Sequence, residues 1–369
     1  PAETLISTEV LPLKQYVVLS HEPWQAIPTR TQQLVTRLKR AQVLFFEPAG
    51  PKERKQGRQV RPGVFLYTLP PAPVVPERAS LLFRRAWQRQ ASQVLRAMSR
   101  HSFRDAVLWT TSPAQVHLLD YLAYQGLIYD CGRDWSHLPL HWEGDLSAAA
   151  DVVFAASPYL RDRLSPCNAN IALIPNGVNF PMFCRTDLDT PPELSGLSGP
   201  VLGWVGAVDA ALDLAPVEYA AKGHSRWQFV LVGPVSDNPR LTYLRELPNV
   251  HLLGPRPMVE VPDYLGRFDV CLDLQRRDRL DSDVIPRRIY EYLSTGKPIV
   301  TMLLPEQVEE FPDVIYGAHS LEEYDRMCAS ALAEDPTWVS PRRRDYGSAA
   351  AWSRRASEIQ RILSGIGLY

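Results

Sequence analysis

Short apolar runs alternate with longer segments of helical periodicity along the first half of the chain. The runs are apolar on both faces, which is typical of strands in a parallel sheet that helices cover on both sides. The strands predicted in this half cover residues 16–19, 43–46, 64–67, 106–109, 127–129, 152–155 and 171–174. Helical patterns lie between several of them, over residues 31–40, 81–99 and 113–123.

The pattern stops at residues 185–200, a stretch rich in Pro, Gly, Ser and Asp that shows no periodicity. This composition predicts an interdomain linker. The alternation then restarts, and most of the new apolar runs are again followed by a helix-length segment. The strands predicted in the second half cover residues 201–205, 229–232, 250–253, 270–274, 299–302 and 314–316.

The alternation predicts an α/β protein of two Rossmann-like, doubly wound domains. We expect an acceptor-side domain over 1–184, the linker, a second domain over 201–348 and a C-terminal helix over 349–369. Four apolar residues fall on one face of that helix, namely Trp352, Ala356, Ile359 and Leu363. Doubly wound sheets bind ligands at the carboxyl ends of their strands. We therefore expect the two domains to face each other across a ligand-binding cleft, with the C-terminal helix crossing back.

Composition and charge narrow the classes of protein. Hydrophobic residues make up 45% and charged residues 22%, which excludes wholesale disorder. The formal net charge of −1 is a cancellation, because residues 1–130 carry 17 basic and 9 acidic side chains, whereas residues 131–369 carry 23 and 32. A nucleic-acid-binding protein would need a more continuous basic face, so we expect no nucleic-acid partner.

The cysteines and the hydropathy of the sequence bear on the cellular compartment of the protein. The five cysteines are an odd number without a CxxC motif, which is typical of free thiols in a reducing environment. No run of 18 apolar residues occurs, and the first 20 residues lack the pattern of a signal peptide. We expect a cytoplasmic protein.

The most informative stretch for function is residues 281–302. Pro286 fits the first position of a helix and Gly296 the position just after its end. A helix N-terminus at the carboxyl edge of a parallel sheet attracts phosphate. Arg288 could bind a diphosphate there, and Glu291, one turn further on, could accept hydrogen bonds from two ribose hydroxyls. Spacing alone favours the alternative of a surface ion pair between these two residues.

The string at residues 286–293, followed by Gly-Lys-Pro at 296–298, resembles the donor-site signature of the GT-B glycosyltransferases. The resemblance implies that Glu291 binds the nucleotide ribose and that Arg288 takes the place of a lysine of the family. Tyr290 lies within the same signature and is predicted to contact the donor. Asp283 stands eight residues before Glu291, where the family has a glutamate that contacts the donor sugar, so the substitution shortens its reach.

Three glycines match further parts of the resemblance. Residues 201–209 (VLGWVGAVD) resemble the first strand and glycine loop of the donor domain, where Gly206 would let the backbone approach the diphosphate. The alternative is that Gly206 only forms a turn. Gly233 and Gly254 resemble the next two strand ends, which frame the nucleobase. Relatives often have an Arg and a Lys after the glycine loop, and residues 207–221 contain neither. Arg288 would then carry the phosphate charge, helped by Arg287, Arg276 or Arg277.

The first half contains HEPW at residues 21–24, RTQQL at 30–34 and YDC at 129–131. With these residues it resembles the family 4-like, teichuronic-acid-type bacterial polysaccharide glycosyltransferases, and it is also similar to the xanthan glucuronosyltransferase. The resemblance implies a general base in residues 127–137, where Asp134 aligns best with the base of the xanthan enzyme and Asp130 is a second candidate. His21, in the first loop, is a third. For each, the alternative is a satisfied loop residue. The absence of a histidine near Asp130 favours an inverting over a retaining mechanism.

Two basic clusters remain in the first domain. Residues 52–61 predict a solvated loop. A helix carries six arginines beside apolar side chains, namely Arg84, Arg85, Arg89, Arg96, Arg100 and Arg104, with Leu82, Phe83 and Trp87. Such a helix could lie on anionic lipid, which predicts a peripheral position on the inner face of the plasma membrane. An ordinary solvated helix face is the alternative.

Together these features predict a glycosyltransferase that moves a sugar from a nucleotide-sugar donor to a hydroxyl group of a glycan or lipid-linked acceptor. We expect the process to be bacterial surface polysaccharide synthesis and the donor to be a UDP-sugar. We expect no metal and no other cofactor, because Arg288 and the helix N-terminus could stabilise the leaving nucleotide. The alternatives are a non-catalytic sugar-binding or scaffold protein with the same fold, and a nucleotide-sugar 2-epimerase.

Overall fold

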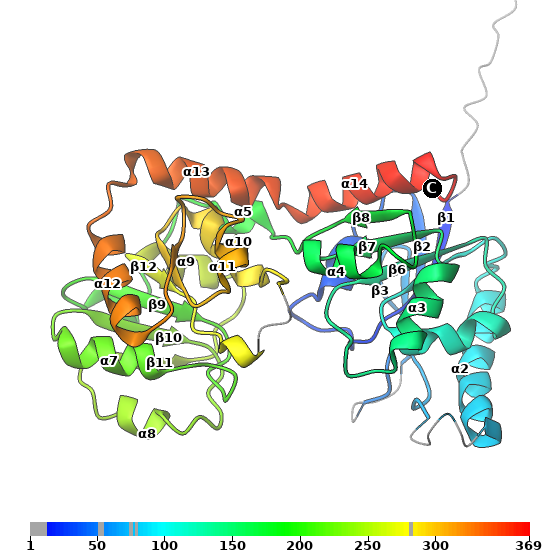
Figure 1. Ribbon diagram of the computed structural model, residues 1–369, viewed down its shortest axis with the longest axis horizontal. Helices are drawn as coiled ribbons and strands as arrows, with labels where there is room; N and C mark the ends of the chain where they lie inside the picture. Colours follow the sequence, from blue (N-terminus) through cyan, green and yellow to red (C-terminus); the bar gives the residue numbers. More distant parts are fainter. Residues whose placement is uncertain (1–12, 51–54, 74–76, 78–79, 280–282) are drawn as a thin grey trace, which may run out of the picture. The chain divides into compact units, whose positions relative to one another are not determined.

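A computed structural model describes residues 13–50, 55–73, 77, 80–279 and 283–369. The chain forms two compact units (Figure 1). Unit 1 comprises Pro1–Ala156, Leu160–Ile174 and Ala356–Tyr369, and unit 2 comprises Ser157–Tyr159 and Pro175–Arg355. The division therefore falls at Pro175, and residues 185–200 lie inside unit 2, where Pro192–Ser195 forms the short helix α6.

Unit 1 is built on an eight-stranded sheet in the order β3-β4-β2-β1-β5-β6-β7-β8. All its strand pairs are parallel except β3 with β4. The strands are β1 (Lys14–Leu19), β2 (Ala41–Glu47), β3 (Gln56–Arg61), β4 (Val64–Thr68), β5 (Val107–Thr110), β6 (Gly126–Cys131), β7 (Val152–Ala155) and β8 (Ile171–Leu173). The central strands are buried on both faces, as their unbroken apolar sequences predict.

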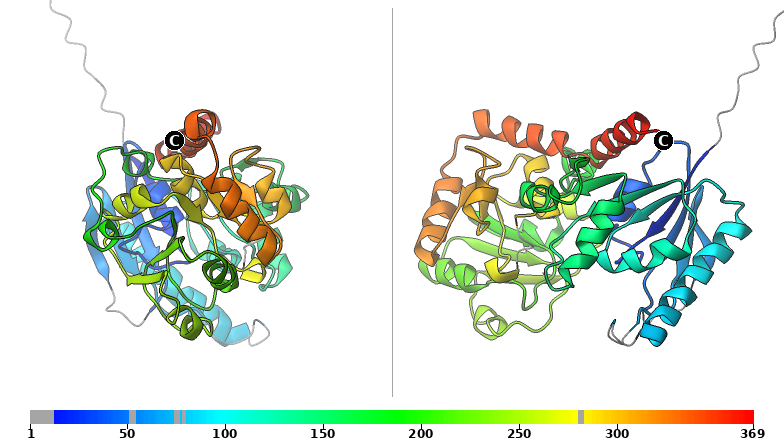
Figure 2. Two further views of the ribbon diagram at one scale, coloured as in Figure 1. Left: turned by 90° about the vertical axis from the view of Figure 1, so that its left-hand side faces the viewer. Right: turned by 45° about the vertical axis from the view of Figure 1, so that its right-hand side comes forward.

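The helices of this unit are α1 (Arg30–Val35), α2 (Ser80–Arg100), the 3₁₀ helix η1 (Pro113–Tyr121) and α3 (Leu140–Ala149). Most of α4 (Pro158–Leu164) and of α14 (Trp352–Gly365) also belongs to it, although the first residues of both helices belong to unit 2. The end of the chain belongs to unit 1, where Leu368 O accepts a hydrogen bond from Tyr16 Oη at 3.3 Å. The side chain of Leu368 also fills the space that a side chain at Gly126 would need. The long helix α2 is the cyan helix in the right-hand view of Figure 2.

Unit 2 is built on a six-stranded, entirely parallel sheet in the order β11-β10-β9-β12-β13-β14. Its strands are β9 (Val201–Val205), β10 (Gln228–Val232), β11 (Val250–Gly254), β12 (Val270–Leu272), β13 (Ile299–Thr301) and β14 (Tyr316–Gly317). The other elements are α5 (Phe180–Phe183), α7 (Ala215–Gly223), α8 (Leu241–Leu244), α9 (Val261–Arg267), the 3₁₀ helix η2 (Arg277–Arg279), α10 (Arg287–Thr295), α11 (Pro305–Val308), α12 (Leu321–Leu332) and α13 (Pro336–Ala349).

Helices cover both faces of the second sheet. Successive residues of a strand point to opposite faces, and accordingly Val230 packs into the apolar cluster that includes residues of α9 and α10, whereas Leu231 packs into the cluster that includes residues of α7 and α12. This two-sided burial confirms the predicted doubly wound α/β class.

The structure corrects four details of the sequence prediction. Residues Gln56–Arg61 form the edge strand β3, not a solvated loop, and residues 52–54 of that prediction lie outside the described residues. The helix predicted over 31–40 ends at Val35. The segment that starts at Pro113 is a 3₁₀ helix. Pro286 caps α10 instead of occupying its first turn.

Each sheet changes winding direction at one pair of strands. In unit 1 this pair is β1 and β5, because β2 lies on one side of β1 and the chain later returns to β5 on the other side. In unit 2 the pair is β9 and β12. Loops diverge at such a switch point, which leaves a crevice beyond the carboxyl ends of the strands. Two candidate site residues closely follow a strand of these pairs, namely His21 after β1 and Gly206 after β9.

Candidate functional site

In unit 2 the first three strands end in loops that are bonded to one another. Gly206, which follows β9, donates its backbone N–H to Val232 O at 2.8 Å. Gly233, which follows β10, donates to Gly254 O, at the end of β11, at 2.9 Å. The three predicted glycines therefore lie side by side on one sheet edge.

Two of these glycines have no room for a side chain. Gly206 has φ +147° and Gly233 has φ +150°, which other residues rarely adopt. A Cβ atom at Gly206 would collide with the guanidinium of Arg288, and one at Gly233 would collide with Gly206 O. Gly206 is therefore more than a turn residue, because its missing side chain makes room for an arginine.

Arg288 is fixed at the switch point of unit 2. Its Nε donates to Val205 O at 2.6 Å, and its guanidinium carbon lies 3.7 Å from the centre of the Trp204 ring. Its Nη1 lies 3.9 Å from Asp273 Oδ1. Among the contacts of the described residues there is no ion pair between Arg288 and Glu291, so the structure does not show the surface ion pair that spacing alone favoured.

The sequence prediction missed Asp273. This residue directly follows β12, and its side chain is only 1% exposed. Its Oδ2 accepts a hydrogen bond from Thr301 Oγ1 at 2.8 Å, while Oδ1 has no hydrogen-bond partner within the described chain. Burial raises the pKa of the carboxyl group, against the lowering effect of Arg288. The available signal in the sequence was an acidic residue directly after a buried strand. That Asp273 lies close to Arg288 is visible only in the fold.

Helix α10 presents its N-terminus to the same edge. Its cap residue Pro286 makes no side-chain cap bond, and no acidic residue lies in the first turn. The start of α10 therefore carries positive backbone dipoles without a capping carboxylate. Glu291 lies on the second turn and accepts no hydrogen bond from the described residues. Burial raises the pKa of its carboxyl group, and Arg287 and Arg288 oppose that rise.

Tyr290 and Asp283 lie beside this edge in different surroundings. Tyr290 is 4% exposed and packs against Phe311 with ring centres 5.9 Å apart. Asp283 Oδ2 accepts from the backbone N–H of Tyr159 at 3.0 Å, and Oδ1 is buried without a hydrogen-bond partner in the described chain. Burial and the charge of Asp283 raise the pKa of Glu310 to about 7.

Two of the three predicted helper arginines, Arg276 and Arg277, are engaged elsewhere. Arg276 forms a two-point ion pair with Asp278 at 2.9 and 2.8 Å. Arg277 donates to Met302 O at 2.9 Å and to Ala318 O at 2.8 Å. Both line a 650 Å³ pocket formed by the loops after β9, β10 and β12. Arg277 therefore ties loops together, and Arg288 is the arginine fixed directly against the glycine loop.

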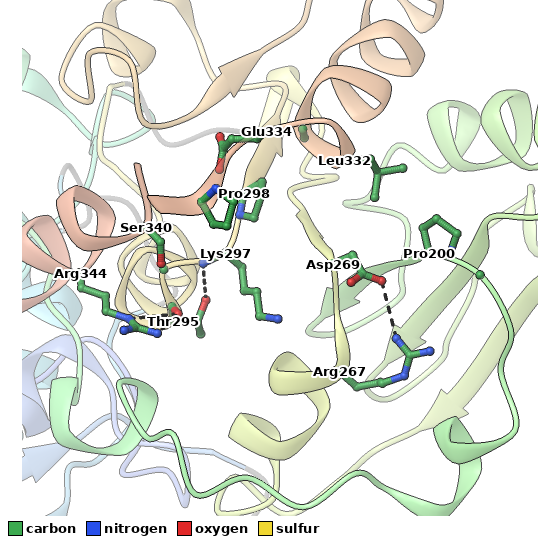
Figure 3. A pocket seen from close by; sticks show the side chains of 14 residues that line it. Pro200, Arg267, Asp269, Thr295, Lys297, Pro298, Leu332, Glu334, Ser340 and Arg344 are labelled. Carbon is green, nitrogen blue, oxygen red and sulfur yellow. Dashed lines mark hydrogen bonds and ion pairs between the residues drawn. The ribbon is translucent and has the colours of Figure 1, made fainter. Parts of the chain in front are cut away.

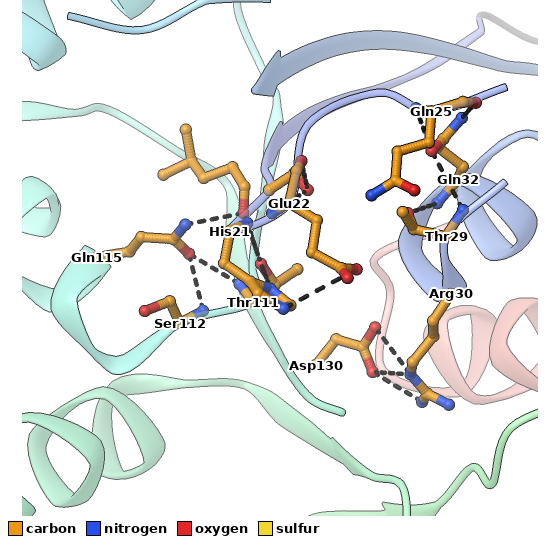
Figure 4. A network of polar contacts seen from close by, with 12 residues as sticks. His21, Glu22, Gln25, Thr29, Arg30, Gln32, Thr111, Ser112, Gln115 and Asp130 are labelled. Atoms are coloured by element: carbon orange, nitrogen blue, oxygen red, sulfur yellow. Dashed lines mark hydrogen bonds and ion pairs between the residues drawn. The ribbon is translucent and has the colours of Figure 1, made fainter. Parts of the chain in front are cut away.

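In unit 1, His21 and Thr111 meet at the switch point between β1 and β5 (Figure 4). Thr111 Oγ1 donates to Leu19 O at 3.1 Å and accepts from the backbone N–H of His21 at 2.9 Å. With its only proton so placed, Oγ1 accepts from His21 Nδ1 at 2.9 Å. We therefore assign the proton of the neutral imidazole to Nδ1, which leaves the lone pair on Nε2.

The surroundings of His21 keep its ring neutral. Burial and the nearby Arg133 lower the pKa of His21 to about 4. Trp135 packs edge-on against the ring with centres 5.0 Å apart, and Glu22 Oε2 lies 3.9 Å from Nε2. At neutral pH the ring can accept a proton at Nε2 but carries no charge of its own.

Asp130 is held in a buried ion pair. Arg30 Nε donates to both of its carboxylate oxygens, at 3.1 and 3.3 Å, and Arg30 Nη2 donates to Oδ1 at 2.8 Å (Figure 4). The Asp130 side chain is 1% exposed. This geometry gives the carboxylate a positioning role toward Arg30 and α1.

Asp134 is more open but is also paired. Its Oδ1 accepts from Arg163 Nη1 at 2.9 Å and from the backbone N–H of Ser136 at 2.9 Å, and the side chain is 24% exposed. The Asp134 carboxylate is therefore held by Arg163 and by the backbone of its own loop. The three candidate bases thus lie in one unit, and His21 is the one whose basic atom is not held by a cation.

One large pocket lies away from these edges. It has a volume of 690 Å³ and is lined by residues that precede β9, β12 and β13, among them Pro200, Asp269 and Pro298 (Figure 3). These are the amino ends of the strands, whereas ligands of doubly wound sheets bind at the carboxyl ends. None of the predicted site residues lines this pocket.

The described residues offer neither a metal site nor a membrane span. Among the described residues, no three His, Cys, Asp or Glu side chains converge to hold a metal ion. Within the same residues, no helix is both long and apolar enough to cross a bilayer.

The arrangement of two doubly wound α/β units in one chain matches solved glycosyltransferase structures of the GT-B fold. The solved structure of sucrose-phosphate synthase from Thermosynechococcus elongatus superposes with a TM-score of 0.72 at 15% identity, covering 96% of this chain and 99% of that one. A trehalose-6-phosphate protein from E. coli, bound with UDP-2-fluoro glucose, superposes with a TM-score of 0.71 at 12% identity, covering 95% and 99%.

The sequence itself is similar to the Bacillus subtilis (strain 168) protein named as the teichuronic acid biosynthesis glycosyltransferase TuaH. The two are 27% identical over an alignment of 266 residues, and the match covers 64% of this chain. The matched stretch spans 66% of that protein, just under two thirds of its length. No protein-family model matches the chain. The predicted resemblance to teichuronic-acid-type glycosyltransferases is confirmed, and that to the xanthan glucuronosyltransferase stays a prediction.

Proposed function

We propose that the protein is a glycosyltransferase that moves a sugar from a nucleotide-sugar donor to a hydroxyl group of a glycan or lipid-linked acceptor in polysaccharide biosynthesis. The observation that carries this proposal is Arg288, which is fixed between Trp204 and the glycine loop at the switch point of unit 2. The similarity to a teichuronic acid biosynthesis glycosyltransferase supports it.

The donor occupies the carboxyl edge of unit 2 in this proposal. Gly206 lets the backbone approach the diphosphate, and Arg288 with the N-terminus of α10 supplies positive charge. Glu291 accepts hydrogen bonds from the ribose hydroxyls. Asp283 and Tyr290 remain predicted donor contacts, and Gly233 and Gly254 frame the base.

The nucleotide is proposed to be uridine diphosphate. A structural neighbour of the same fold was solved with UDP-2-fluoro glucose, which supports this choice. We expect no metal requirement, because positive charge at Arg288 and α10 can stabilise the leaving diphosphate. Activity that persists at full rate in excess EDTA would support this expectation.

His21 is proposed as the general base. Its Nε2 takes the proton of the acceptor hydroxyl while the oxygen forms a bond to the anomeric carbon of the donor. The bond from that carbon to the diphosphate breaks in the same step, and the nucleotide leaves with the electron pair. This single displacement inverts the anomeric configuration. Asp134 is the second candidate base, and Asp130 positions Arg30.

The exposed face of α2 is proposed to rest on an anionic membrane surface. Leu81 and Leu82 are 61% and 58% exposed near its start. Arginines and no acidic residues follow on the exposed positions of the same helix, namely Arg84, Arg85, Arg89, Arg96 and Arg100. Exposed leucines beside several arginines suit a peripheral contact with anionic lipid. Sedimentation with liposomes should then increase with the anionic lipid fraction, and Arg85→Glu should reduce it.

A thermal-shift panel of UDP-, GDP- and dTDP-sugars tests the donor. A ligand present at 100 times its dissociation constant stabilises the folded protein by about 2.7 kcal/mol. We expect this shift with a UDP-sugar, and its loss in Glu291→Ala. If none of the three nucleotide-sugars raises the melting temperature, the assignment of a nucleotide-sugar donor site to unit 2 is wrong.

A non-catalytic sugar-binding protein is the second candidate function. The absence of any Arg or Lys from 207 to 221 favours it, because charge that many glycosyltransferases place after the glycine loop is missing. Slow release of nucleotide from a UDP-sugar by the purified protein would count against this candidate, since a binding protein leaves the donor intact.

A further inference from the structure

A cavity in unit 1 lies among helices instead of at a strand edge. Its volume is 430 Å³, and side chains of α2, η1 and α3 line it. None of the predicted site residues and none of the proposed catalytic groups belongs to this lining. The cavity is therefore separate in its residues from the His21 site.

Aromatic rings form the inner wall of the cavity. The ring of His117 is surrounded by Phe83 at 4.8 Å, Trp142 at 4.7 Å and Trp87 at 5.4 Å between ring centres. Trp142 is partly exposed, whereas Phe83 and Trp87 are buried. The cavity thus offers one reachable indole ring that is supported from behind by further rings.

Carboxylates form the rim. Asp120, Asp145 and Glu77 all line the cavity, and Trp142 Nε1 donates to Glu77 Oε2 at 3.2 Å. Burial lowers the pKa of His117, while Glu77, Asp120 and Asp145 act to raise it. All three carboxylates are therefore close enough to affect the central histidine, which is neutral at pH 7.

The wall also contains buried polar atoms without a hydrogen-bond partner. Trp87 Nε1 and His117 Nε2 have none in the part of the chain that the structure describes. Buried polar groups are normally satisfied by protein or by ordered water. Because neither atom is exposed to the cavity, each is a property of the wall behind it, and neither argues for or against a ligand inside.

The charges exclude most other ligand classes. Three carboxylates against the one guanidinium of Arg84 repel phosphates, nucleotides and uronic acids. An apolar chain would bury these carboxylates without partners, which is costly. A small organic cation would also suit the carboxylates and the indole ring, so the test below includes one as the competing outcome. Sugar hydroxyl groups both donate and accept, and the C–H face of a pyranose can cover an indole ring.

We propose that this cavity binds a neutral sugar unit of the acceptor glycan, stacked on Trp142 and hydrogen-bonded to Asp120 and Asp145. The inference rests on the proposed function, because it gives the acceptor-side unit a glycan ligand. It extends that function by naming a holding site for the glycan that lies outside the reacting groups.

The test is a titration without any nucleotide, followed by saturation-transfer NMR and calorimetry. The probes are maltotriose and triacetylchitotriose as neutral glycans, trigalacturonate as an anionic glycan and tetramethylammonium as a cation, each up to about 10 mM to detect millimolar binding. We expect at least one neutral glycan to bind. Binding of only the anionic probe or only the cation, or of none of the four, would overturn the proposal.

Variants locate the binding. Trp142→Ala should weaken binding of the neutral glycan about tenfold because the stacking ring is lost, and Trp142→Phe should retain most of it. Trp338, which is 78% exposed on α13 of unit 2, gives the matched control, and Trp338→Ala should leave binding unchanged. Equal affinity in wild type and Trp142→Ala would place the glycan elsewhere and overturn the assignment.

Failure here is distinguishable from failure of the proposed function. Nucleotide binding is measured in unit 2 with a UDP-sugar and the Glu291→Ala variant, in the absence of glycan. Donor binding without neutral-glycan binding would overturn this inference and leave the proposed function intact. Binding of the neutral glycan without binding of the UDP-sugar would leave the glycan site intact and contradict the proposed transferase function.

Discussion

The guanidinium carbon of Arg288 lies 3.7 Å from the centre of the Trp204 ring. Stacking of a cation on an indole contributes about 0.5–2 kcal/mol, depending on burial. Trp204 also donates its Nε1–H to Gly206 O at 3.1 Å. One buried indole therefore orients both the arginine and the glycine loop, and the diphosphate of a donor would meet the two together.

Arg288 is expected to contribute strongly to nucleotide affinity. Arg288→Ala should weaken UDP binding by about 2 kcal/mol, roughly thirtyfold, because charge-assisted hydrogen bonds to the diphosphate are lost. Arg288→Lys keeps the charge but lacks the planar group that stacks on Trp204, so an intermediate loss is expected. Calorimetry with UDP measures both. Arg326, exposed on α12, supplies the control Arg326→Ala. Wild-type affinity in Arg288→Ala would contradict the donor site.

If His21 is the general base, sugar transfer should remain active to a lower pH than is usual for a histidine base. Because the pKa of His21 is lowered to about 4, the ring stays neutral down to that pH, and the acid limb of kcat/KM should fall near pH 4 instead of near 6.5. His21→Asn keeps a donor near the Nδ1 position but removes Nε2, and should lower kcat by about 10²–10⁴. The control is His137→Asn, since His137 also packs against Trp135. Full activity in His21→Asn would exclude His21 as the base.

Substitutions at Asp130 and at Asp134 should differ in how much they lower the free energy of unfolding. Asp130→Asn breaks a buried ion pair and leaves Arg30 uncompensated, so we expect a loss of about 3 kcal/mol in the free energy of unfolding, measured with urea. Asp134→Asn affects a partly exposed pair and should cost less than about 1 kcal/mol. A large fall in kcat for Asp130→Asn at unchanged stability would argue for a chemical role instead.

Glu310 is expected to destabilise the protein above neutral pH. Its pKa in the folded state, about 7, lies above the ordinary value for a glutamate, so folding favours the protonated form. This contribution is present at low pH and is lost as the pH rises through 7. Glu310→Gln should therefore stabilise the protein at pH 8, by about 1 kcal/mol after allowance for solvent screening, and change little at pH 4. The exposed neighbour Glu309 gives the control Glu309→Gln. An equal effect at both pH values would refute the coupling to Asp283.

The sequence predicted the buried strands better than the edges. β1 and β6 were recognisable because parallel strands covered on both faces are continuously apolar. β3 was missed because an exposed edge strand with the sequence QGRQVR has no apolar face to detect. The end of the chain was assigned to a helix, but its membership of unit 1 depends on long-range contacts such as Tyr16 with Leu368.

The candidate site was partly predictable for a similar reason. Gly206 and Arg288 were found because their motifs are local, although their mutual contact across 82 positions was not visible. Asp273 was missed because its importance comes from the neighbouring strand and from Arg288. The sequence also contained no sign that Asp130 pairs with Arg30, because the two are 100 residues apart and meet only in the fold.

The claim that unit 2 binds a nucleotide through Glu291 has the most direct test. Calorimetric titration compares UDP with 2′-deoxy-UDP on wild type, on Glu291→Ala and on Glu322→Ala, an exposed control on α12. We predict that wild type and Glu322→Ala prefer UDP, and that Glu291→Ala binds UDP about 2 kcal/mol more weakly and has lost the preference. Unchanged UDP affinity in Glu291→Ala would contradict the account.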